Sequence, residues 1–160
     1  MKKFTIQAAF LVIIMMAALA FATAKIPQIP LPNTTQKSNF SEVKINDLVV
    51  KVEIADTQSK RQKGLGDRES LATDSGMLFI FPETKKYNFW MKGLKFPLDI
   101  IWIRAGVVVD VIKNAEPPLS GQADETLPIY TSNELIDSVI EVNAGFVDQQ
   151  NIKVGDKVTK

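Results

Sequence analysis

The sequence predicts a mainly β domain: a compact antiparallel β-sandwich or partly closed barrel with one or two short helices, after an N-terminal apolar helix and a linker. Short stretches of alternating apolar and polar residues recur from Phe40 onward, with turn signals about every 8–12 residues, which is typical of sandwiches and barrels. The helical stretches are too short to be the crossovers of a parallel sheet. The chain has 160 residues, which fits one domain with an appendage.

Composition excludes several classes of chemistry. The chain has 19 basic and 18 acidic residues, a net charge of +1, and lacks the basic excess typical of nucleic-acid binders, so we expect no nucleic-acid partner. It contains no cysteine, which excludes disulfides, thiolate nucleophiles and cysteine-based zinc sites. It contains no histidine, the commonest general base and metal ligand. We therefore predict no metal site and no cofactor.

The N-terminus has the pattern of an export signal. Lys2 and Lys3 precede the apolar stretch 4–22, and Ala22-Thr23-Ala24 matches a signal-peptidase site. The apolar stretch is also close to the roughly 20 residues that a membrane-spanning helix needs. Residues 1–24 are thus predicted to be a signal peptide or a membrane anchor, which contacts the membrane through residues 4–22 if it is uncleaved. Both interpretations predict an extracytoplasmic protein, secreted or tethered to the cytoplasmic membrane.

The remainder divides into a linker and one folded domain. Residues 25–40 contain three prolines followed by polar residues, without periodicity, and are predicted to be a proline-rich flexible linker. Residues 41–160 are predicted to form a single β domain that folds without disulfides.

The first half of this domain is predicted to contain a hairpin, a helix and two further strands. They are strands at 43–45 and 48–54 around an Asn46-Asp47 turn, a helix over TQSKRQK (57–63) capped by Asp56 or Thr57 and ended by Gly64 and Gly66, a strand GMLFIF (76–81) that stops at Pro82, and its antiparallel partner YNFWMK (87–92).

The second half is predicted to contain a hairpin, a long loop and three short elements. They are strands Leu98–Ile103 and Val107–Ile112 around Arg104-Ala105-Gly106, a loop over 115–128, a strand Val139–Val142, a helix Ala144–Gln150, and a closing strand Lys157–Thr159 after a Gly155-Asp156 turn.

A series of motifs resembles a known family. These are Gly64-Leu65 with Arg68, GMLF (76–79), FWMK (89–92), PLD (97–99), and Glu141 with Gly145. Over about residues 48–158 the chain resembles domain-of-unknown-function family 192 of bacteria and archaea. The resemblance implies a compact, mainly β domain of sandwich type, often with an export signal or one membrane span, and it implies no activity. The chain has Gly93-Leu94 where the family usually has Asn-Thr, and Gly66 where it usually has Met.

Charged residues inside apolar strands suggest a site. Asp99 interrupts PLDIIWI and Glu141 interrupts VIEV, and a buried charge should be paired. Arg68, Lys92 or Lys95 could pair with Asp99. Alternation along residues 87–92 places Asn88, Trp90 and Lys92 on one face, opposite Tyr87, Phe89 and Met91. The candidate ligand-binding residues are Arg68, Trp90, Lys92, Asp99 and Glu141.

Three interpretations of this set remain open. The residues could form structural ion pairs that fix strand register. They could line a pocket in which Trp90 stacks on a ligand ring and the charged groups hydrogen-bond to it. Asp99 and Glu141 could instead act as paired carboxylates of a hydrolase. The sequence favours an extracytoplasmic domain that binds a small polar ligand or an envelope component, with carbohydrate as one candidate, over a hydrolase of envelope polysaccharide or a purely structural envelope module. The aromatic residue Trp102 and the period-two set Met77, Phe79 and Phe81 are interpreted as core.

Overall fold

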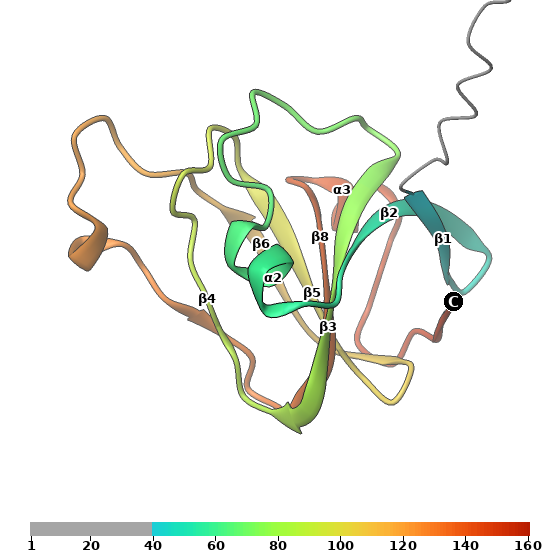
Figure 1. Ribbon diagram of the computed structural model, residues 1–160. Coiled ribbons are helices and arrows are strands. Elements are labelled where there is room, and N and C mark those ends of the chain that lie inside the picture. Colours follow the sequence, from blue (N-terminus) through green and yellow to red (C-terminus); the bar gives the residue numbers. More distant parts are fainter. Residues whose placement is uncertain (1–39) are drawn as a thin grey trace, which may run out of the picture. The chain divides into compact units, whose positions relative to one another are not determined.

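The computed structural model describes residues 40–160; the predicted signal or anchor (1–24) and nearly all of the predicted linker lie outside the described residues. Strands dominate this part of the chain (Figure 1). In chain order the elements are β1 (Phe40–Ile45), β2 (Leu48–Ala55), α2 (Gln58–Lys63), β3 (Ser75–Lys85), β4 (Asn88–Phe89), β5 (Leu98–Arg104), β6 (Val107–Ala115), the 3-10 turn η1 (Asp124–Thr126), β7 (Tyr130–Thr131), β8 (Ile136–Asn143), α3 (Phe146–Gln149) and β9 (Val158–Thr159). Within residues 40–160, no helix is long and apolar enough to cross a membrane.

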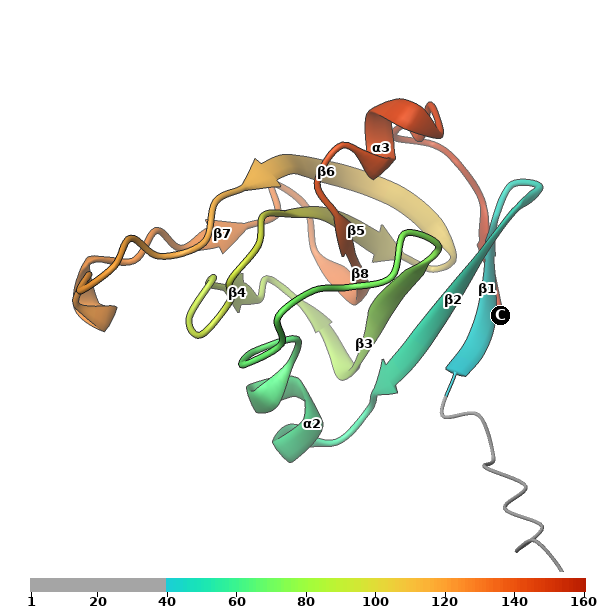
Figure 2. The ribbon, with the colours of Figure 1, turned by 90° about the horizontal axis from the view of Figure 1, so that it is seen from above.

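One curled sheet forms the frame of the domain. Its seven strands have the order β6-β5-β8-β3-β2-β1-β9, and β4 and β7 pair separately as a two-stranded sheet. Figure 2 shows the large sheet bending so that β6 arches over its central strands. This confirms the predicted mainly β class and the partly closed barrel with short helices.

One strand pair differs from the predicted antiparallel arrangement. β2 and β3 run parallel, with Val52 opposite Gly76 and Ala55 opposite Phe79. A parallel pair needs a crossover of about a dozen residues or more. Residues 56–74 provide it through α2 and a following loop, so a helix that we considered too short for a crossover serves as one because irregular chain extends it.

The predicted hairpins are confirmed. β1 and β2 pair from Phe40↔Glu53 to Ile45↔Leu48 around Asn46-Asp47. β5 and β6 meet at Arg104↔Val107, and the turn residues Ala105 and Gly106 have positive φ angles of 49° and 72°. Such angles match the right-handed twist of the flanking strands in a two-residue hairpin loop.

The predicted pairing of residues 87–92 with β3 is wrong. Only Asn88 and Phe89 form a strand, and they pair with Thr131 and Tyr130 of β7. Both edges of β3 are already occupied by β2 and β8, so no position beside β3 is open. β3 also continues past Pro82 to Lys85, because its pairing with β8 is interrupted between Ile80 and Lys85 and a proline there removes no ladder hydrogen bond.

Both faces of the central strands are buried. Cluster 1 is the apolar core that the sheet curls around, and it includes Val43 of β1, Ile140 of β8 and Val108 of β6. Cluster 2 lies on the opposite face and includes Phe79, Trp102 and Phe89. Trp102 and Phe79 are therefore core residues, as predicted.

The sheet closes through its last strand. Val158 of β9 pairs with Ile45 of β1, and Lys157 forms a bridge with Val107 of β6. The Val158 N–H donates to the Gly106 carbonyl at 2.8 Å, and the Gly155 N–H donates to the Val108 carbonyl at 2.8 Å. The segment around β9 thus joins the two ends of the sheet.

Asp99 ties three elements together. It lies on β5, on the cluster 1 side, and is fully buried. Its Oδ1 accepts a hydrogen bond from the Asn114 N–H, and its Oδ2 accepts one from the Val147 N–H in the first turn of α3, both at 2.9 Å. The carboxylate therefore satisfies two backbone donors that would otherwise lack a partner.

We predict that Asp99→Asn lowers the free energy of unfolding by about 2–4 kcal/mol. The amide nitrogen that replaces one oxygen would face a backbone N–H and leave that donor unsatisfied. Denaturant unfolding measures the loss. Asp148→Asn is the matched control, since its exposed carboxylate only pairs with Lys113 at the surface, and it should cost less than about 1 kcal/mol. Equal losses in the two variants would contradict the structural role of Asp99.

Candidate functional site

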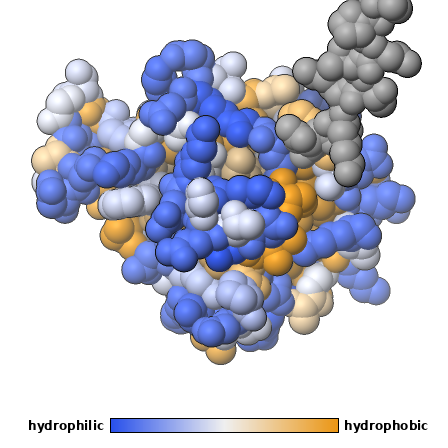
Figure 3. Space-filling view, viewed as in Figure 1, coloured by the Kyte–Doolittle hydropathy of each residue, from blue (hydrophilic) through white to orange (hydrophobic). Residues whose placement is uncertain are grey.

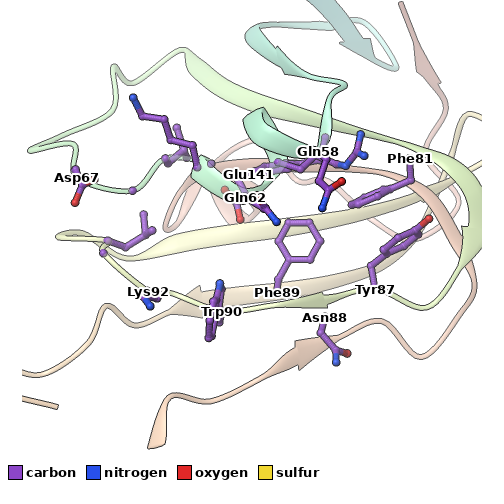
Figure 4. A pocket seen from close by; sticks show the side chains of 18 of the residues that line it. Gln58, Gln62, Asp67, Phe81, Tyr87, Asn88, Phe89, Trp90, Lys92 and Glu141 are labelled. Carbon is purple, nitrogen blue, oxygen red and sulfur yellow. The ribbon is translucent and has the colours of Figure 1, made fainter. Parts of the chain in front are cut away.

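A pocket of about 970 Å³ lies against cluster 2, over β3 and β8. One wall comes from α2 and the loop after it, and the other from residues 85–94 around β4 (Figure 4). The outer surface over α2 is mainly hydrophilic (Figure 3). Its lining residues are Gln58, Arg61, Gln62, Lys63, Gly64, Leu65, Gly66, Asp67, Phe79, Phe81, Pro82, Glu83, Lys85, Tyr87, Asn88, Phe89, Trp90, Lys92, Gly93, Leu94 and Glu141.

Glu141 forms the buried polar part of the pocket. It lies on β8 between Met77 of β3 and Ile100 of β5, and its side chain is only 5% exposed. Burial raises the pKa of its carboxyl group to about 8, and no hydrogen bond or ion pair within residues 40–160 offsets that burial. At neutral pH the group is therefore mostly protonated, in a position where it can donate or accept a hydrogen bond.

Aromatic rings surround Phe89 in the centre of the pocket (Figure 4). The Phe89 ring packs edge-on against Phe79 and against Trp102, each with centroids 5.1 Å apart. Phe81 and Tyr87 stack at 3.7 Å. Contacts of this kind hold the rings in defined positions, so this wall is preformed and apolar.

Three cations at the rim are already engaged. Arg61 Nη1 donates to the carbonyls of Asp56 and Ile80 at 2.7 and 2.8 Å, and its guanidinium lies 5.4 Å from the Phe81 ring centroid. Lys85 Nζ lies 5.2 Å from the Tyr87 centroid.

Lys92 Nζ lies 5.3 Å from the Trp90 centroid and 2.6 Å from the Asp124 carboxylate. Each of these three cations therefore has a partner, and no ion pair joins any of them to Glu141 within residues 40–160.

The structure separates the five predicted site residues into two groups. Trp90, Lys92 and Glu141 line the pocket, while Arg68 and Asp99 do not. Alternation placed Trp90 and Lys92 correctly on the exposed face of their segment. Trp90 is 48% exposed, so its ring is open to solvent at the rim.

The ion pairs that we expected around Asp99 do not form. Arg68 makes a two-pronged ion pair with Glu53, with its Nη2 2.9 Å from Oε2, and this pair lowers the pKa of Glu53. Asp99 is satisfied by backbone donors instead. Asp99 lies opposite Val142 in the β5–β8 register while Glu141 lies opposite Ile100, so the two carboxylates point to opposite faces of the sheet.

Sequence analysis missed most of the pocket lining. Gln58 and Gln62 come from α2, whose exposed polar residues have no pattern that distinguishes a wall from a solvated helix. Phe81 and Tyr87 were assigned to the core, and each is only partly buried. The departures from the family pattern, Gly66 and Gly93-Leu94, were the available signal, since all three residues line the pocket.

A metal site is not apparent in the described part of the chain. Within residues 40–160, no three side chains of the acidic, histidine or cysteine type are grouped to hold an ion.

Comparisons with known proteins give a family and two similar structures. The family model DUF192, described as "Uncharacterized ACR", matches residues 41–160. A crystal structure from Sinorhizobium meliloti 1021, named as a candidate transcription regulator, is 32% identical with a TM-score of 0.64 over 74% of this chain and 89% of that chain. A protein of unknown function from Novosphingobium aromaticivorans DSM 12444 is 28% identical with a TM-score of 0.68 over 76% of this chain and 85% of that chain. No curated protein matches this chain.

We predict that Glu141 makes the stability of the domain depend on pH. The folded domain holds the Glu141 proton more tightly than the unfolded chain, where the carboxyl has its ordinary pKa of 4.5. The free energy of unfolding should therefore fall as pH rises from about 4.5 to about 8, on the order of 1 kcal/mol per pH unit. Glu141→Gln removes this contribution, so denaturant unfolding from pH 5 to pH 9 should show the variant gaining stability relative to the parent.

The exposed Glu42 of β1 provides the control, because Glu42→Gln removes a carboxyl group from the surface and should change the free energy of unfolding by less than about 1 kcal/mol. If Glu141→Gln runs parallel to the parent, Glu141 is not buried in its neutral form.

Proposed function

Since the chain belongs to the DUF192 family, whose description names no activity, we propose a function from its pocket: an exported domain that binds a small polar ligand or a cell-envelope component, with carbohydrate as one candidate. The match over residues 41–160 confirms the resemblance found in the sequence. One observation carries the proposal, namely that a buried carboxyl group without a partner in the described chain lines an aromatic pocket.

The state of Glu141 argues against a purely structural module. Buried polar groups in a structural core are usually hydrogen-bonded, as Asp99 is here, although the buried Trp102 Nε1 of cluster 2 has no partner within residues 40–160. An unpaired carboxyl costs stability, and such perturbed groups concentrate at functional sites. A ligand in the pocket would provide the missing partner.

The rim adds groups suited to orient a ligand. The half-exposed ring of Trp90 offers an apolar face on which a sugar or another flat group can stack. Asn88 and Gln62 bring amide groups to the lining, which can donate and accept hydrogen bonds. An apolar pocket with a few polar groups is the usual form of a small-molecule site.

The hydrolase alternative requires Asp99 and Glu141 to lie close together, and they do not. Two carboxyl groups must flank one bond for paired glycosidase chemistry. Asp99 and Glu141 occupy opposite faces of the sheet, and Asp99 is engaged with the Asn114 and Val147 N–H groups. We therefore favour binding over hydrolysis.

We do not propose a role in transcription for this chain, although the similar Sinorhizobium structure is named as a candidate transcription regulator. With 19 basic and 18 acidic residues, the sequence lacks the basic excess that neutralises phosphates.

We predict that the pocket binds at least one member of a defined panel. Thermal-shift measurements on the full chain would use glucose, glucosamine, N-acetylglucosamine and muramyl dipeptide. A binder should raise the melting temperature of the parent, and Trp90→Ala should remove that rise because the stacking face is lost. Leu135→Ala is a matched control. The exposed fraction of Leu135, 46%, is similar to the 48% of Trp90, and Leu135 does not line the pocket. No shift with any panel member, or an equal shift in the Trp90 variant, would count against the pocket as the site.

Export is predicted from Lys2, Lys3, the apolar stretch 4–22 and the Ala22-Thr23-Ala24 motif. A reporter that is active only outside the cytoplasm, fused after Lys160, should be active. The intact mass of the mature chain then separates secretion from tethering, because cleavage gives a chain that starts at Lys25. Activity from a cytoplasmic reporter alone would refute both forms of the prediction.

A further inference from the structure

We propose that the ligand of this pocket carries a protonated amine, which forms an ion pair with Glu141 while its apolar body packs on the Phe79–Phe89 wall. The inference rests on the proposed function and specifies the chemical class that the site selects.

Glu141 needs a donor that the described chain does not supply. Its oxygens can accept several hydrogen bonds when ionised, and burial is the only influence on its pKa within residues 40–160, with no donor offsetting it. An ammonium group offers up to three N–H donors and a positive charge. Charge-assisted hydrogen bonds of this kind are about twice as strong as neutral ones.

The charged groups around the pocket leave this position open. Arg61 and Lys63 come from α2, Asp67 from the following loop, Glu83 and Lys85 from the end of β3, and Lys92 from the segment after β4. None of these cations forms an ion pair with Glu141 in the described chain. Arg61 is bound to two carbonyls and Lys92 to Asp124, so moving either toward Glu141 would break an existing contact.

The aromatic rings of the pocket differ in whether a cation of the protein lies against them. The outer rings Phe81, Tyr87 and Trp90 each lie against a cation of the protein itself. Within the described residues, the inner rings Phe79 and Phe89 have no such cation. Phe79 and Phe89 are only 3% and 9% exposed, so a ligand ammonium at Glu141 would meet a small part of each ring and would depend mainly on the ion pair.

Binding requires a defined proton transfer. The free site holds a neutral carboxyl near pH 7, and the amine arrives as an ammonium ion. When the ion pair forms, the carboxyl O–H bond breaks and its proton passes to buffer, while the ligand keeps all of its own protons. Close to one proton per ligand should therefore be released at pH 7.

The test compares amines with their acetylated counterparts on the full chain. Three pairs vary the body that carries the amine: glucosamine and N-acetylglucosamine, phenethylamine and N-acetylphenethylamine, cadaverine and N,N′-diacetylcadaverine. Calorimetric titration at pH 7 in two buffers of different ionisation enthalpy gives affinity and proton release together. For at least one pair, the amine should bind about tenfold or more tightly than the acetylated form, which corresponds to one ion-pair contact, and should release close to one proton.

Two variants identify the residue responsible. Glu141→Gln should reduce the affinity ratio within that pair to about one and abolish proton release, while Glu42→Gln should leave both unchanged. Tight binding of an acetylated probe or of glucose without proton release would overturn the amine inference and leave the proposed binding function standing. Failure of all three amines to bind at millimolar concentration would also overturn the amine inference. A preserved amine preference in Glu141→Gln would place the charge recognition elsewhere.

Discussion

Burial of β8 on both faces governs both the core and the pocket of this domain. Because successive side chains point to opposite faces, Ile140 and Val142 enter cluster 1 while Val139 and Glu141 face the cluster 2 side. A one-residue slip in register would exchange these faces and bury a carboxyl inside the curl of the sheet. The register that completes the apolar core therefore also presents one carboxyl group to the pocket.

The walls of the pocket come from the two places where the chain leaves the main sheet. The crossover 56–74 returns the chain so that β3 can run parallel to β2, and α2 at its start forms one wall. Residues 86–94 cannot pair with β3, whose two edges are occupied, so they form the opposite wall and pair only briefly with β7. The cavity is thus a consequence of topology, and its lining residues come from segments without extensive pairing.

Local features of this fold were predictable from sequence, and distant pairings were not. Alternation and turn residues identified the β1–β2 and β5–β6 hairpins, because both signals lie within a few residues. The separation of β3 from residues 87–92 depends on β2 and β8 occupying both edges, which no local pattern records. Asp99 and Glu141 looked equivalent, each a charge in an apolar strand. They differ because backbone donors from Asn114 and Val147 reach only Asp99, and those contacts exist only after β5, β6 and α3 have packed.

Closure of the sheet by β9 has a kinetic consequence. The contact between the Lys157 N–H and Asn46 Oδ1, at 3.1 Å, joins residues 111 positions apart, and the β1–β9 pairing spans a similar distance along the chain. Contacts between such distant segments slow folding because a long loop must be closed before they form. Until β9 docks, the edges of β1 and β6 that it covers expose unpaired N–H and C=O groups, which are templates for association with other chains. Before β9 pairs with β1, therefore, these edges leave the chain open to association with other chains.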